Sequence, residues 1–141
     1  MAAARRSTLI VAAIAAALGA AGVAAAAAAA HTDGGGLLAT ASQMLTVHAA
    51  AGLALAALCE ATGGPSALVA LAIALQTGVA LFAADLAARR LFGERLFPFA
   101  APIGGSLTIL CWVALSLWAA AALRKPPRNT ASAREEIGRD Q

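Results

Sequence analysis

Four polar side chains lie inside or at the ends of long apolar stretches, and they are the residues best equipped for chemistry. They are His31, His48, Gln76 and Asp85. A histidine can relay a proton or bind a metal, and a carboxylate can hold a proton or a cation. Because a polar group in an apolar setting costs free energy, each one needs a function or a partner. His31, His48 and Asp85 form the candidate functional cluster.

Each of these residues also has a structural interpretation. His48 shares a helix face with Gly52, a small-residue face that suits an interhelical hydrogen bond. The alternatives for His48 are a proton relay, a substrate contact or a metal ligand. Asp85 precedes Arg89 by four residues, a spacing typical of an ion pair along one helix. Gln76 is expected to bond to a neighbouring helix.

Motifs of catalysis and of cofactor binding are missing from the sequence. There is no phosphate-binding glycine loop and no GxSxG, HExxH or CxxC pattern. The two histidines with Asp33 or Asp85 could assemble a zinc site, but their spacing matches no zinc pattern. Cys59 and Cys111 lie in apolar runs, where cysteine acts as a small apolar filler. We therefore expect no enzyme, no cofactor and no metal.

Four apolar segments must position these side chains: residues 8–30, 41–61, 66–88 and 100–123. Each reaches the roughly 20 residues that a helix needs to cross a bilayer. Hydrophobic residues make up 61% of the 141-residue chain and charged residues 12%, which is too apolar for a soluble domain. Backbone groups in lipid must bond within their own segment, so each segment should be a helix. The sequence predicts an all-α integral membrane bundle of four transmembrane helices within residues 1–123, with the lipid bilayer as its partner.

The two ends of the chain differ in character. Residues 124–141 contain Pro126, Pro127 and mixed charges, so we expect a disordered tail. The first apolar segment, preceded by Arg5 and Arg6, has a rival interpretation as a cleavable secretion signal. A signal core is usually only ~7–15 residues long, which favours a retained helix.

The basic residues predict an orientation. If the chain crosses four times, three arginines (Arg89, Arg90 and Arg95) lie on one face of the membrane. The opposite face carries seven basic residues, which are Arg5, Arg6, Arg124, Lys125, Arg128, Arg134 and Arg139. Cytoplasmic loops carry the excess of Lys and Arg, so both termini should be cytoplasmic.

Position along the segments predicts the depth of each candidate. His48 should lie ~10 Å from the start of its helix, in the outer half of the membrane and facing the bundle interior. Asp85 should lie ~5 Å from the end of its helix, on the same side, and Gln76 near the midplane.

Small residues predict where helices approach closely. The expected packing positions are Gly52, Gly78, Pro102, Gly104 and Gly105. Replacing Gly105 with leucine should weaken the bundle.

Several stretches resemble one known family. The sequence FPFAAPIGGSLTILCW, which ends at Trp112, is similar to the motif I-T-P-x-G-G-x-x-F-x-x-G-W of the domain-of-unknown-function-423 family of small inner-membrane proteins. GVALFAAD resembles that family's G-x-x-L-F-S-G-S, with Asp85 in place of a serine, and SQMLTVHAAAGLAL resembles its Y-Q-x-x-H-x-L-A-L. The resemblance covers about residues 8–123. It implies four transmembrane helices in a bacterial inner membrane and no established activity.

These features predict a small structural or accessory membrane protein without enzymatic activity. It would belong to a larger membrane complex or form a homo-oligomer. The chain has no tyrosine and only two tryptophans, so a surface that stacks on nucleic-acid bases is not expected. The alternative is a minimal carrier of small molecules or ions that uses His48 and Asp85. An accessory protein would co-purify with its complex, whereas a carrier would have a water-accessible cavity around His48.

Overall fold

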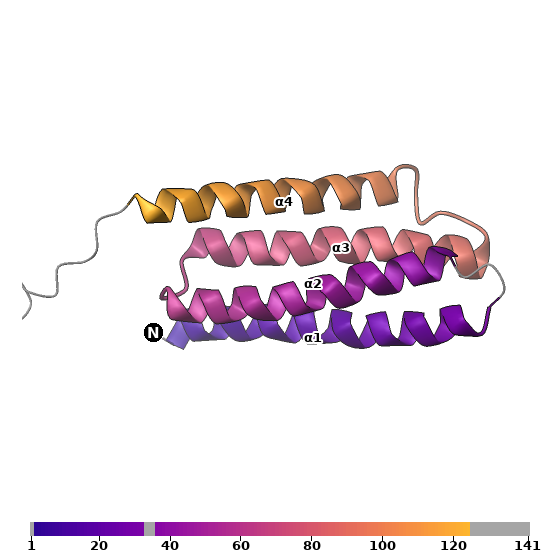
Figure 1. Cartoon of the computed structure of the whole chain (residues 1–141), viewed down its shortest axis with the longest axis horizontal. Coiled ribbons are helices and arrows are strands. Elements are labelled where there is room, and N and C mark those ends of the chain that lie inside the picture. The colour runs from indigo at the N-terminus through magenta and orange to yellow at the C-terminus, as the bar shows by residue number, and fades with distance from the viewer. Residues whose placement is uncertain (1, 33–35, 125–141) are drawn as a thin grey trace, which may run out of the picture.

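The computed structural model describes residues 2–32 and 36–124, which form four antiparallel helices and no strand (Figure 1). The helices are α1 (Ala2–Ala30), α2 (Gly36–Ala61), α3 (Ser66–Phe92) and α4 (Ala100–Leu123). All four are long and apolar enough to cross a membrane. The predicted all-α class with four helices is thus confirmed. The predicted tail lies outside the described residues, apart from Arg124.

Three helices are longer than their apolar segments. α1 begins at Ala2 instead of residue 8, α2 begins at Gly36 instead of residue 41, and α3 continues to Phe92 instead of residue 88. The last turn of α3 contains Arg89 and Arg90, whose charges interact favourably with the helix C-terminus. Gly93 follows the last helical residue as the C-cap and adopts the left-handed conformation with φ 77°. Hydropathy marks where a chain is apolar, whereas a helix ends where its backbone turns.

The helices pack mainly with their neighbours in sequence. α1 lies along α2, α2 along α3 and α3 along α4, and α1 also touches α3. α4 lies on the side of α3 away from α1 (Figure 1). The start of α1 and the end of α4 lie at the same end of the bundle, as four crossings require.

The buried apolar residues form two clusters, one toward each end of the bundle. The cluster near the α2–α3 turn contains Val11, Leu55, Ala56, Cys59, Leu68, Ala72, Leu75, Cys111 and Leu115. The cluster near the α3–α4 connection contains Ala41, Leu45, Val79, Ala83, Leu86 and Ala101. Small and polar residues lie between the two along the helices. We call these residues the mid-bundle layer: His48 and Gly52 of α2, Gln76 and Gly78 of α3, and Gly104 and Thr108 of α4.

Candidate functional site

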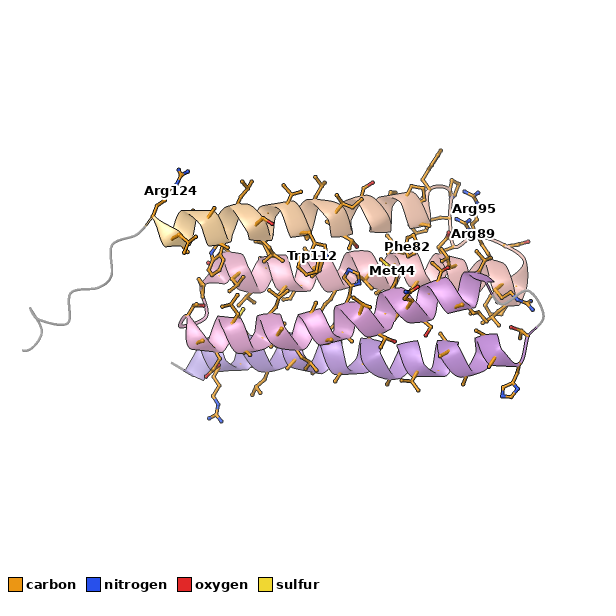
Figure 2. The ribbon with its side chains drawn as sticks, viewed as in Figure 1. Met44, Phe82, Arg89, Arg95, Trp112 and Arg124 are labelled. Atoms are coloured by element: carbon orange, nitrogen blue, oxygen red, sulfur yellow. The ribbon has the colours of Figure 1, made fainter. Side chains whose placement is uncertain are left out.

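His48 is buried in the mid-bundle layer with both ring nitrogens engaged. Its Nδ1 lies 2.8 Å from the carbonyl oxygen of Met44, one turn earlier in α2. The indole N–H of Trp112 in α4 donates to His48 Nε2 over 3.3 Å. Nδ1 faces an acceptor and Nε2 faces a donor, so the contacts fit one neutral tautomer, protonated on Nδ1. His48 thereby joins α2 to α4, and Met44 and Trp112 lie near the middle of the molecule (Figure 2).

The distance predicted between His48 and the start of its helix was too short. With α2 beginning at Gly36, His48 is the thirteenth of its 26 residues and lies at the helix midpoint. The prediction counted from residue 41 and so placed the ring too close to the helix start. Its burial agrees with an inward-facing ring, since only 8% of the residue is exposed.

Gln76 presents an unusual polar group in the same layer. The residue is fully buried, and neither its amide nitrogen nor its amide oxygen has a hydrogen-bond partner within the described part of the chain. The amide packs against Gly52, where an added Cβ atom would lie 3.2 Å from Gln76 Cδ and 2.8 Å from Ala15 Cβ. Glycine at position 52 therefore makes room for both neighbours. The expected interhelical bond of Gln76 is not formed with any described residue.

Helices α3 and α4 approach most closely at Gly78 and Gly104. A Cβ atom on Gly104 would lie 2.6 Å from both Gly78 O and Phe82 N, and one on Gly78 would lie 2.8 Å from Thr108 Oγ1. The Thr108 hydroxyl donates to Gly104 O over 2.9 Å, so it needs no partner in α3. Small residues let the two backbones touch here.

The other two expected packing positions behave differently. A Cβ atom on Gly105 would lie 3.6 Å from the Phe82 ring, an ordinary contact with space to spare. Pro102 is exposed among the described residues. It lies in the first turn of α4, where a residue without an N–H group is tolerated because no intrahelical acceptor precedes it.

Asp85 is buried and has two partners at the α3–α4 connection. The Arg89 guanidinium forms the ion pair that the spacing of four residues predicted. The backbone N–H of Leu96 also donates to Asp85 Oδ1 over 3.0 Å. One carboxylate therefore holds the end of α3 and the following loop together. Arg89 and Arg95 lie near each other at this end of the bundle (Figure 2).

The contacts do not bring the predicted cluster of His31, His48 and Asp85 together. His31 is exposed just beyond the end of α1, His48 is at the midpoint of α2, and Asp85 is engaged near the end of α3. In residues 2–32 and 36–124, no group of three or more His, Cys, Asp or Glu side chains is placed to hold a metal ion. Among the described residues, the polar contacts of the helices are hydrogen bonds and the ion pair of Asp85 with Arg89.

Sequence reasoning missed two contacts that hold the helices together. Trp112 lies at the thirteenth of 24 positions in α4, away from the helix ends where tryptophan usually lies in membrane proteins. That central position was the available signal for its bond to His48. The second contact joins α1 and α2, where the Ser42 hydroxyl donates to Gly22 O over 2.8 Å. Its signal was a glycine in one apolar segment and a serine in the next.

Comparison with known proteins identifies a family. No curated protein and no solved structure matches the chain. The model of the family described as "Protein of unknown function (DUF423)" matches residues 9–105, from α1 into the first turns of α4. This match covers more than half of the chain, including His48, Gln76, Asp85 and Gly104. The chain therefore belongs to the DUF423 family.

Proposed function

We propose that this chain is an integral membrane protein without catalytic activity, which acts as a structural or accessory component of the bacterial inner membrane. The proposal rests on the hydrogen bonds that polar side chains of the helices make within the protein. His48 bonds to Trp112, Ser42 bonds to Gly22, and Asp85 bonds to Arg89 and Leu96. Groups that could relay protons or bind ligands are engaged in joining one element to another.

The outer surface of the helices supports placement in a bilayer. α4 exposes large apolar side chains along its length, among them Ile109, Leu110, Val113 and Leu117. In water such a surface would be a liability, whereas lipid tails cover it without cost. Arg124 lies at one end of the bundle, and Arg89 and Arg95 lie at the other (Figure 2). The larger basic count on the side of Arg124 favours cytoplasmic termini.

Membrane placement and orientation are tested together. Sodium carbonate washing of membranes should leave the full chain in the pellet, because four apolar helices resist extraction at high pH. A reporter enzyme that works only in the cytoplasm should be active when it is fused after Gln141. A reporter that works only in the periplasm should be inactive there. Release by carbonate would refute the membrane placement, and activity of a periplasmic reporter would refute the orientation.

The accessory role is tested by stoichiometric co-purification in a mild detergent. We expect a defined membrane partner, or a second copy of the chain, to remain bound. Binding should weaken when exposed side chains of α4 are shortened, as in Leu110→Ala with Leu117→Ala. The matched control is Leu53→Ala, which shortens an exposed leucine of α2. A chain that is monomeric and free of partners in native membranes would contradict the role.

A carrier is the second candidate, and the Gln76 amide favours it. A fully buried amide without a partner among the described residues could bind a small polar solute near the middle of the helices. The original carrier hypothesis used His48 and Asp85, but both have their own partners.

Cysteine labelling separates the two candidates. Gln76→Cys is made in a background with Cys59 and Cys111 replaced by alanine. A structural protein should leave this thiol unreactive toward a membrane-impermeant maleimide. Rapid labelling would indicate a water path to the centre of the bundle, and the carrier would then replace the structural role.

A further inference from the structure

The end of α3 and its connection to α4 expose an unusual density of large apolar side chains. Five of the nine residues from 91 to 99 are large, apolar and exposed: Leu91, Phe92, Leu96, Phe97 and Phe99. This segment joins the end of one membrane-length helix to the start of the next. It therefore lies at the level where a bilayer gives way to water, and Phe and Leu side chains at that level can insert at the boundary of headgroups and acyl chains.

The backbone keeps one of these rings exposed at a conformational cost. Phe99 has φ 68° and is the single non-glycine residue with positive φ in the described part of the chain. A bulky residue in this region is strained. Even so, Phe99 is 67% exposed, and its side chain contributes no cap to the start of α4. Packing inside the protein does not account for a phenylalanine here, whereas insertion of the ring among lipids would.

The charges beside these rings leave one cation unpaired. Asp85 forms its ion pair with Arg89 and accepts the N–H of Leu96. Arg95 is exposed and lies near enough for its charge to act on Asp85. However, no carboxylate of residues 2–32 and 36–124 is in direct contact with the Arg95 guanidinium. Asp85 is already bound by two donors, so the exposed Arg95 guanidinium offers its donors to an anion outside the protein.

We propose that the α3–α4 connection is a binding site for an anionic phospholipid. The Arg95 guanidinium binds the phosphodiester oxygens, for which its planar pair of donors is suited. The Phe97 and Phe99 rings pack among the glycerol and upper acyl-chain atoms of the same lipid or its neighbours. Asp85 positions the site by holding the backbone of Leu96, the residue after Arg95. The proposal rests on the placement of the four helices across a bilayer.

The test is the binding of phosphatidylglycerol to the purified full chain in a neutral detergent, measured by native mass spectrometry. Phosphatidylcholine, which has no net charge, is the comparison lipid. We expect Arg95→Gln to weaken phosphatidylglycerol binding about five-fold, the effect of one arginine beside an anionic headgroup. Arg95→Lys should recover part of the loss, because the charge remains while the paired donors are gone.

Arg124→Gln is the matched control, because Arg124 is also an exposed arginine at a helix end but lies at the opposite end of the bundle. This variant should bind phosphatidylglycerol like the unmodified chain. Equal losses in both variants would overturn the site, since they would show attraction to net charge alone. Equal binding of the two lipids would also overturn it, as would equally tight binding of glycerol phosphate. A chain that resists carbonate extraction but shows no such lipid preference would refute the lipid site and leave the membrane placement intact.

Discussion

The unpaired amide of Gln76 allows a sharp prediction, because its removal should make the protein more stable. The most informative substitution is Gln76→Met, which keeps an unbranched side chain of similar length and removes both polar atoms. Shape matters at this position, since the amide fills the space beside Gly52. A branched side chain would add a packing change that methionine avoids.

The expected magnitude follows from the burial of the amide. Gln76 has no exposed surface, and its nitrogen and oxygen have no partner among the described residues. Burying an amide without a hydrogen bond costs about 1–3 kcal/mol by mutational measurements. In the unfolded state in detergent the amide reaches water or other partners, so this cost falls on the folded state alone. Gln76→Met should therefore raise the free energy of unfolding by about 1–3 kcal/mol.

The assay is reversible unfolding in mixed micelles of increasing sodium dodecyl sulfate content, followed by tryptophan fluorescence. Thr77→Val is the matched control, because Thr77 is exposed and donates only to Ile73 O within its own helix. This control should change stability by less than about 0.5 kcal/mol. A loss of 1 kcal/mol or more in Gln76→Met would refute the reasoning, since it would show that the amide is hydrogen-bonded in the folded protein.

Three further predictions test the contacts between elements. Gly104→Ala should destabilise the protein by about 1–3 kcal/mol because the new methyl group meets the backbone of α3. Its control, Gly105→Ala, should be neutral. Equal effects of the two in the same unfolding assay would contradict the close approach of α3 and α4. Trp112→Phe removes the donor to His48, and a double-mutant cycle with His48→Asn should give a coupling energy of about 0.5–1 kcal/mol; additive effects would show that the bond does not form. Asp85→Asn should lower the unfolding temperature and increase proteolysis of the α3–α4 connection. Unchanged values of both would show that the carboxylate does not hold that loop.

Local features of the bundle were predictable from the sequence because they depend on spacing within one helix. The Asp85–Arg89 ion pair follows from a separation of four residues. The four helices follow from apolar length, since a helix is the structure that satisfies its own backbone in lipid. Gly52, Gly78 and Gly104 stand out because small residues mark close helix contacts.

Contacts between helices were harder to predict because they depend on the rotation and the starting point of each helix. Counting from residue 41 instead of Gly36 placed His48 too near the helix start, and that error grouped it with Asp85. Periodicity placed His48 on the same face as Gly52 but could not identify Trp112 as its partner. The bond from Leu96 to Asp85 depends on the path of a loop, which residue spacing within a helix does not describe.

The order in which the helices pack also bears on how the protein is made. Ribosomes deliver α1, α2 and α3 before α4, and these three helices already contact one another. Their mutual packing can therefore be complete while α4 is still being synthesised. The backbone of α4 then has to meet only that of α3, through the narrow contact between Gly78 and Gly104. A chain that stalls before α4 would leave the face of α3 around Gly78 uncovered.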